Sequence, residues 1–263
     1  IRRQRQMCIR DRDLDDGTAF GYTYFKGKTA ELTVTADYRQ PGRHQDICPT
    51  KGYFIQAKAA REFNDFIDGF EINADKGTLQ EVYTPYDYNR FELLADRYLK
   101  SPISKDHGVT LTADLGYIDE VVDDFFYLYA GGLDGMKGYS YYSLGGTRKA
   151  IVRGTYTFPI MRDIARNLGF ISLDKVYLLA YGDVGNAWDG DFERDDLKTD
   201  AGAGIKVQFY SFTTFPTALT FDAAYGFDEF RVTSDDITDT YGKEWRLYFT
   251  LLFNFNLRHS LIH

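Results

Sequence analysis

The sequence lacks any run of apolar residues long enough to cross a membrane as a helix. Such a helix needs about 18 or more consecutive apolar residues, and polar or charged residues interrupt this chain of 263 residues at much shorter intervals. Proline is also scarce, with 6 residues, whereas there are 24 glycines and 17% of the chain is aromatic. A transmembrane helix is therefore excluded, and the composition suits one large all-β domain.

An excess of basic charge is missing as well. The chain has 31 Lys and Arg against 39 Asp and Glu, a net charge of -8. Binding to a phosphate backbone needs clustered Lys and Arg, so no nucleic-acid partner is expected. The mean hydropathy of -0.39 would ordinarily indicate a soluble protein. A barrel wall, however, carries one polar residue for each apolar one, so averaged hydropathy conceals it.

The sequence has little of the chemistry that enzymes and metalloproteins use. No Ser, Cys or His lies in a nucleophile motif, and no histidine has metal-ligand spacing. The four histidines are His44, His107, His259 and His263. We therefore expect no catalytic residue, no metal and no cofactor, and the protein is not expected to be an enzyme.

The strongest pattern present is a two-residue alternation in residues 244–255, which read EWRLYFTLLFNF. The apolar set is Trp245, Leu247, Phe249, Leu251, Phe253 and Phe255. Arg246, Tyr248, Thr250, Leu252 and Asn254 take the other face. This is the period of a strand, and its length matches the roughly 9–11 residues that a tilted strand needs to cross a hydrocarbon layer. The segment is predicted to be a membrane-spanning β-strand.

The same alternation recurs in residues 30–39, 109–117, 203–210 and 219–227. Repeated segments of this kind, separated by turn-rich stretches, are typical of a transmembrane antiparallel β-barrel of the outer membrane. Eleven strands are predicted near residues 18–25, 29–38, 53–63, 90–98, 108–118, 125–131, 148–159, 175–187, 201–212, 217–227 and 244–255. Because bacterial single-chain barrels have even strand numbers, we expect an incomplete barrel.

The alternation also places charged residues on the inner, lumen face. A Lys or Arg on the lipid face would cost about 2–4 kcal/mol at the membrane midplane. The residues predicted to point inward are Glu31, Asp37, Lys58, Asp114, Arg153, Asp183, Lys206, Asp222 and Arg246. A soluble lipocalin-like barrel would show the opposite arrangement, with apolar residues inside.

The predicted connections differ in length. Residues 26–28 and 213–216 read as tight turns, typical of the periplasmic side, whereas the long loops belong to the exterior. The long connections are residues 39–51, 133–147, 189–200 and 228–243. The last two are acidic but lack the ligand spacing of a calcium site, so we expect solvated loops. Residues 64–89 admit a hairpin about residues 74–77, and residues 161–174 admit a short helix.

The first twelve residues, IRRQRQMCIRDR, differ from the rest. They are basic, without strand period and without the apolar region of a secretion signal. They resemble translated sequencing-adapter read-through, so we expect residues 1–12 to be non-native and residues 13–263 to be the carboxy-terminal part of a barrel domain. Cys48 would then be the one native cysteine, and it cannot form an internal disulfide framework.

Residues 131–146 read GGLDGMKGYSYYSLGG, which is too long and too rich in Gly and Tyr for an ordinary surface loop. They are followed by RKAIVRGTYTFPI and KVYLLAYGDVGNAW. These three pieces in this order resemble the outer-membrane assembly and translocation barrels, the BamA-like bacterial surface antigen superfamily. The resemblance covers residues 125–255, and the earlier residues match only as generic barrel strands.

The resemblance implies a 16-stranded barrel in the outer membrane of a Gram-negative bacterium, of which this chain would supply about eleven strands. It implies insertion or translocation of protein substrates. The expected partners are outer-membrane lipid, unfolded outer-membrane or secreted proteins, and periplasmic accessory proteins. Two other functions remain open, a passive diffusion channel and a membrane anchor for a periplasmic or surface domain that is missing from this chain.

The resemblance also implies a loop lock. In that family a loop folds back into the lumen and carries a hydrophobic, basic, Gly, aromatic signature, which Met136, Lys137, Gly138 and Tyr139 match. The basic residue pairs with the acid of an aromatic-x-Asp-x-Gly motif on the wall, and here that acid is Asp183. We therefore expect Lys137 to lie within hydrogen-bonding reach of Asp183.

Two positions depart from the family pattern. Lys137 replaces the commoner Arg, so a bidentate fork to the carboxylate is lost and the contact becomes a point charge. Thr155 stands where many members carry a second acidic partner. Both departures weaken the implied assembly activity without weakening the implied fold.

Overall fold

The computed structural model describes the backbone of residues 2–11, 20–40, 48–74, 77–104, 107–162, 164–212, 215–234 and 237–253. The strands are β1 (Arg2–Asp11), β2 (Phe20–Asp37), β3 (Gly52–Asn73), β4 (Thr78–Lys100), β5 (Gly108–Ile118), β6 (Leu128–Tyr129), β7 (Gly145–Gly146), β8 (Arg148–Met161), β9 (Arg166–Leu168), β10 (Ile171–Trp188), β11 (Lys198–Ser211), β12 (Phe215–Gly226), β13 (Phe230–Ser234), β14 (Ile237–Tyr241) and β15 (Trp245–Phe253). Three 3-10 turns are η1 (Asp124–Phe126), η2 (Tyr141–Ser143) and η3 (Arg194–Asp196). No helix within these ranges is long and apolar enough to cross a membrane.

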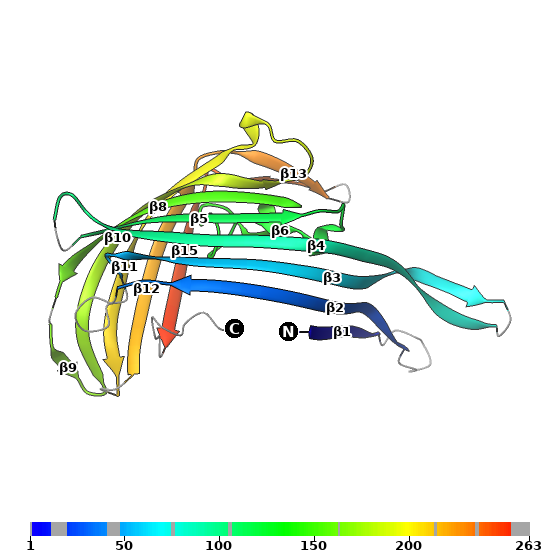
Figure 1. The fold of residues 1–263 in the computed structure, drawn as a ribbon, viewed down its shortest axis with the longest axis horizontal. Helices are drawn as coiled ribbons and strands as arrows, with labels where there is room; N and C mark the ends of the chain where they lie inside the picture. Colours follow the sequence, from blue (N-terminus) through cyan, green and yellow to red (C-terminus); the bar gives the residue numbers. More distant parts are fainter. Residues whose placement is uncertain are drawn as a thin grey trace.

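The strands form one large, strongly curved antiparallel sheet (Figure 1). Its order is β1-β2-β3-β4-β5-β8-β10-β11-β12-β15, and β9 pairs with β10. Two short hairpins, β6-β7 and β13-β14, lie outside this sheet. The predicted all-β class and antiparallel pairing are therefore confirmed. In the described part of the chain β1 pairs only with β2 and β15 only with β12, so the sheet has two edges and is not closed.

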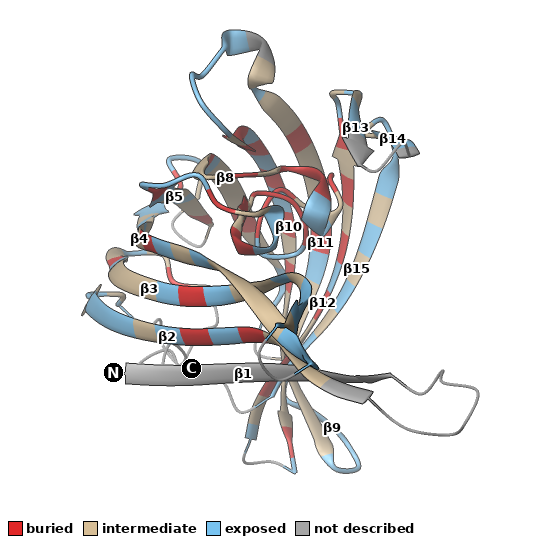
Figure 2. Cartoon of the chain, turned by 90° about the vertical axis from the view of Figure 1, so that its right-hand side faces the viewer, coloured by how far each residue is buried: buried red, intermediate tan, exposed pale blue. Residues whose placement is uncertain are grey.

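The two faces of the sheet differ in character. On β12 Phe221 is 48% exposed, whereas its neighbour Asp222 is 2% exposed. On β15 Leu247, Phe249 and Leu251 are all more than half exposed. The buried residues gather on the inner side of the curved sheet, where residues 131–146 lie (Figure 2). The predicted register of the carboxy-terminal strands is therefore the observed one, with the apolar set facing outward.

Two predicted breaks in the amino-terminal strands are wrong. Residues 26–28 do not turn but continue β2, where Gly27 pairs with Asn64 of β3. Residues 64–89 hold no loop apart from the hairpin tip, because β3 and β4 pair through almost their full lengths. The hairpin expected about residues 74–77 is present, and Gly77 adopts a φ of 62° there. Interleaved charges such as Asp65 interrupt the apolar alternation in this part of the sequence, so these strand ends resemble a loop.

Two other predicted elements are also wrong. Residues 125–131 form no strand of the main sheet but the turn η1 and the two-residue β6. Residues 161–174 form no helix in their described part, because residues 166–168 pair back on β10 across a turn at Gly169, whose φ is 64°. Residues 2–11, expected to lack strand structure, form β1 against β2. Their non-native origin stays a prediction.

The antiparallel order assigns each connection to one end of the sheet. Residues 119–147, 189–197 and 227–244 lie at one end, which we call the loop end. The connections between β4 and β5, β8 and β10, and β11 and β12 lie at the opposite end, the turn end. The connection from β2 to β3 is at the turn end, so the expectation that all four long connections share one side is wrong.

An aromatic cluster fills the inner face of β2 to β4 near the loop end. Phe126 of η1 packs against Phe25, Tyr86 and Tyr88, with ring centroids 5.4 to 5.9 Å apart. Phe25, Tyr88 and Phe126 are buried together with Ile118, Val122 and Leu128. Both η1 and β6 bury apolar side chains in this cluster. The conformation of the segment is therefore set by packing in the cluster and not by pairing in the main sheet. The cluster holds the start of the 119–147 connection inside the curve of the sheet.

Candidate functional site: the in-folded loop and the inner wall

Residues 131–146, which we call the in-folded loop, lie against the inner face of β8, β10, β11 and β12. Met136 and Tyr139 at its tip are 0% and 1% exposed. The Met136 N–H donates to the Ala130 carbonyl at 2.7 Å, and the Gly132 N–H donates to the Tyr139 carbonyl at 3.0 Å. These backbone bonds make the tip a compact turn that presents its side chains to the wall.

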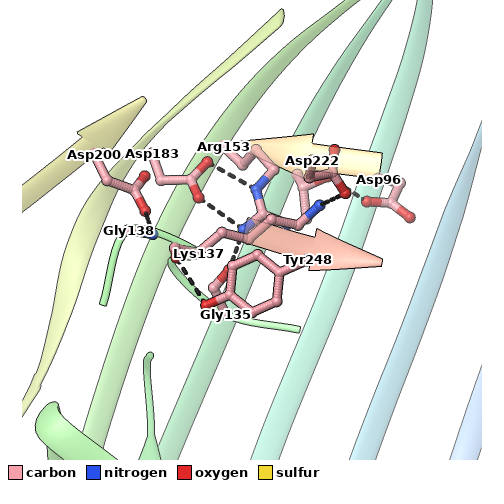
Figure 3. Close-up of polar contacts among 10 residues, drawn as sticks. Asp96, Gly135, Lys137, Gly138, Arg153, Asp183, Asp200, Asp222 and Tyr248 are labelled. Atoms are coloured by element: carbon pink, nitrogen blue, oxygen red, sulfur yellow. Dashed lines mark hydrogen bonds and ion pairs between the residues drawn. The ribbon is translucent and has the colours of Figure 1, made fainter. Parts of the chain in front are cut away.

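Lys137 points from the loop tip to a carboxylate on β12. Its Nζ donates to Asp222 Oδ2 at 2.8 Å, where the two side chains are 16% and 2% exposed (Figure 3). The Nζ also lies 4.9 Å from the centre of the Tyr181 ring. On the other side, the Tyr248 hydroxyl of β15 donates to the Lys137 carbonyl at 2.8 Å. The lysine is thus held by β10, β12 and β15 together.

The predicted partner of Lys137 was Asp183, and the structure corrects that pairing. Asp183 receives two bonds from Arg153, Nε to Oδ1 and Nη2 to Oδ2, each of 2.7 Å. Arg153 of β8 stands directly opposite Asp183 of β10 in the strand register. A planar guanidinium matches a carboxylate with two parallel bonds, which a point-charge lysine cannot do. Lys137 therefore pairs with Asp222 instead.

Asp183 is still connected to the loop, because Arg153 reaches both. The same Nη2 that bonds Asp183 also donates to the Gly135 carbonyl. The predicted inward position of Arg153 is confirmed, whereas its contact with the loop is not evident from the alternation. Its position opposite Asp183 could be found only from the pairing register of β8 and β10, which single-sequence periodicity does not give.

Gly138 makes the closest approach of the loop to the wall. Its N–H donates to Asp200 Oδ2, and Asp200 is 3% exposed. A Cβ at position 138 would lie 2.6 Å from the Asp200 Cβ and 2.6 Å from the backbone nitrogen of Gly226. Any side chain would have to push the loop away from β11 and β12, so the loop requires glycine here.

Asp200 was expected in the solvated acidic loop 189–200, and this assignment is wrong. It is an inner-face residue of β11, directly opposite Asp183 and Gly226. Extending the alternation of Gly202, Gly204 and Lys206 backwards by two residues would have placed Asp200 inward. The acidic composition of the preceding loop concealed this signal.

Tyr139 ties the loop to the connection between β12 and β15. Its hydroxyl donates to the Thr199 carbonyl at 2.7 Å and accepts from the Asp228 N–H at 3.0 Å. Burial raises the pKa of this hydroxyl, so it stays protonated at neutral pH and remains a donor. Asp228 in turn accepts from the Thr199 N–H at 2.6 Å. Asp228 was predicted to lie in a solvated loop, so its contacts with Thr199 and Tyr139 were not expected.

Three buried polar atoms beside the lock have no hydrogen-bond partner within the described residues. They are the Tyr181 hydroxyl, Asp200 Oδ1 and Asp222 Oδ1. Below the loop tip, a cavity of about 280 Å³ is lined by residues that include Lys137, Arg153, Tyr181, Lys206 and Asp222. The cavity is polar and large enough for several water molecules, which would satisfy the oxygens of Tyr181 and Asp222 at its wall. The predicted inward placement of Lys206 therefore agrees with its position on the cavity wall.

The site thus combines an ion pair that joins the loop to the wall with a polar cavity beside it. No group of three or more His, Cys, Asp or Glu that could hold a metal ion occurs in the described ranges. No protein-family model matches the chain, and no curated protein does. The resemblance of the loop to a known family therefore stays a prediction, and it rests on Met136, Lys137, Gly138 and Tyr139, which the structure brings to the wall together.

The ion pair between Lys137 and Asp222 should show strong thermodynamic coupling. Lys137→Ala should lower the free energy of unfolding in lipid by about 3 kcal/mol, because it leaves a buried carboxylate without its cation. Adding Asp222→Asn should cost little more. Urea unfolding in vesicles of the unaltered protein, the two single variants and the double variant measures the coupling. Asp114→Asn, whose own partner is Lys149, is the control and should be additive with Lys137→Ala. Strong coupling to Asp183 would contradict the observed pairing.

Gly138→Ala should release the loop tip, because its methyl group would meet the backbone of β12. Overpacking of this kind typically costs about 1–3 kcal/mol. Gly182→Ala is the matched control, since a Cβ there meets only the Asp200 carbonyl at 3.7 Å. Limited proteolysis should cut residues 131–146 faster in Gly138→Ala than in the unaltered protein or Gly182→Ala. Equal cleavage of all three would show that the loop does not depend on this close contact.

Proposed function

We propose that this chain is part of an outer-membrane β-barrel of the BamA-like superfamily that inserts or translocates protein substrates. Its location would be the outer membrane of a Gram-negative bacterium. The single observation that supports this most is the distribution of polarity across the sheet. The outer face is apolar and exposed, and the inner face carries buried charges.

The outer face of β15 carries Trp245, Leu247 and Phe249, which are 66 to 69% exposed. Leaving such side chains in water forgoes about 1.5–3 kcal/mol each relative to full burial. On the inner face Asp183 and Asp222 are 4% and 2% exposed and pair with cations. A water-soluble sheet would place these groups the other way round, whereas a lipid-facing wall favours this arrangement.

One further feature favours handling of polypeptides over passive diffusion. The in-folded loop lies against β8, β10, β11 and β12 and is held there by the ion pair between Lys137 and Asp222. A loop in this position leaves less room for free diffusion through the lumen. The resemblance of the loop to the assembly and translocation barrels implies unfolded outer-membrane or secreted proteins as substrates, with periplasmic accessory proteins as partners.

The lipid-facing register of β15 can be tested with two adjacent residues. Leu251→Arg should reduce insertion into phosphatidylcholine vesicles by about 2–4 kcal/mol, because the outward side chain would enter hydrocarbon. Thr250→Arg should be tolerated, because Thr250 faces inward opposite Thr220. Reversible folding into vesicles measures both variants. Equal losses would overturn the assignment of the outer face to lipid.

Single-channel recording separates the proposed function from the passive channel. With the in-folded loop in place, the reconstituted protein should give low, fluctuating conductance. A diffusion channel should give large, steady steps. Lys137→Ala should raise the open probability, because it removes one contact that holds the loop. Large steady steps from the unaltered protein would contradict the proposal.

A further inference from the structure

The outer face of the sheet is hollowed over β2, β3 and β4. Two adjoining hollows of about 420 and 630 Å³ lie there and share Leu32, Ala59 and Phe91. The strand register explains the shape. Leu32 stands opposite Ala59, which stands opposite Phe91, and the next row consists of Val34, Ala57 and Leu93. Small side chains on β3 thus form the floor of a trough whose walls are the larger side chains of β2 and β4.

The trough is open to the outside and mainly apolar, although Glu31, Arg61 and Asn89 also line the larger hollow. Its walls at Leu32, Val34 and Phe91 are 66%, 60% and 46% exposed. On the proposed function this face meets the hydrocarbon of the membrane. A smooth wall would meet lipid chains along one side only, whereas a trough surrounds one chain on three sides and gains dispersion contacts with it.

A cation stands at the loop end of the trough. Arg61 is the next outward residue of β3 after Ala59, and it lines the larger hollow. Within the described residues it has no carboxylate at ion-pair distance. The carboxylate of Asp119 accepts from the Asn89 backbone N–H at 2.7 Å and side-chain amide at 2.6 Å. These bonds, and to a smaller extent the charge of Arg61, lower the pKa of Asp119. The Arg61 guanidinium rests instead over the Phe63 ring, 5.3 Å from its centre.

Lys28 adds a second outward cation. Lys28 stands opposite Phe63, and Arg61 stands opposite Ala30, so the two basic residues are diagonal neighbours on one face. Diagonal positions are about 7–8 Å apart, within reach of two long side chains that bind one anion. Lys28 is exposed and has no ion pair in the part of the chain described.

We propose that this trough binds a phosphate-bearing membrane lipid, with an acyl chain along β3 and the phosphate on Arg61 and Lys28. The inference rests on the proposed membrane location. The distance supports one leaflet, because the four residue-to-residue steps from Ala57 to Arg61 span about 14 Å at roughly 3.4 Å each, about half of a hydrocarbon core of ~30 Å. Since the cations lie toward the loop end, the lipid belongs to the leaflet on that side.

Native mass spectrometry of the protein in dodecyl maltoside can test the site with two matched lipids. Dioleoyl phosphatidic acid has both acyl chains and phosphate, whereas dioleoylglycerol has the same chains without phosphate. The unaltered protein should retain phosphatidic acid in preference to dioleoylglycerol. Arg61→Gln with Lys28→Gln should weaken this binding roughly fivefold for each cation removed. Ala59→Phe, which fills the trough, should weaken it while keeping both charges.

Arg97→Gln is the matched control, because Arg97 is an exposed, outward cation of β4 at the turn end. It should bind phosphatidic acid like the unaltered protein. Equal binding by all variants, equal retention of both lipids, or full competition by inorganic phosphate would overturn the lipid site. Insertion into phosphatidylcholine vesicles is measured in parallel. A protein that inserts but shows none of these differences refutes the lipid site alone, whereas failure to insert refutes the membrane proposal and the lipid site with it.

Discussion

The structure depends on the hydrogen bonds and ion pairs that three buried carboxylates on adjacent strands receive. Asp183, Asp200 and Asp222 lie on the inner faces of β10, β11 and β12. A buried charge without a partner destabilises a protein by several kcal/mol. Asp183 is compensated by Arg153 from the neighbouring strand, and the other two receive donors from the loop, a backbone N–H and the Lys137 ammonium. The loop and the wall therefore stabilise each other, and neither has its observed charge balance alone.

This mutual dependence connects the polarity of the two faces. Asp183 and Asp222 pair with cations inside the curved sheet, whereas the outer face of β15 carries exposed apolar side chains. Glycines make the inner arrangement compact, since a Cβ at Gly204 would lie 2.2 Å from Asp222 Oδ1. On the outer face, small residues of β3 have the opposite effect and leave a hollow that protein atoms do not fill. The same strand period thus produces a packed inner lock and an open outer trough.

The strands could be predicted from the sequence where the apolar alternation is regular. The prediction fails where charges on both faces or aromatic packing interrupt that alternation. The outward set of β15 and the inward position of Asp222 follow from a period of two. The distal halves of β3 and β4 carry charges on both faces, which hides them from the same criterion. Residues 125–131 follow an aromatic cluster instead of a period. Element type was therefore predictable near the proposed hydrocarbon layer and unreliable beyond it.

The loop residues of the site could be predicted from the sequence, whereas their partners on the wall could not. The motif around Lys137 and Gly138 identified the loop tip, because these neighbouring residues themselves make the contacts with the wall. The partner of Lys137 depends on which cation stands opposite Asp183, and that is a property of strand register. Asp200 and Asp228 were hidden by acidic neighbours in the chain. Long-range pairing, rather than local chemistry, is what a single sequence did not specify here.

Zero-length carbodiimide coupling tests the central claim most directly, since it joins a lysine to a carboxylate only where the two already touch. In the folded protein in lipid, the account predicts an amide between Lys137 and Asp222, identified by mass spectrometry of the linked peptides. The exposed pair of Lys243 and Glu229, 3.7 Å apart, shows that the reagent is active. Coupling of Lys137 to Asp183 instead of Asp222 would contradict the lock described here.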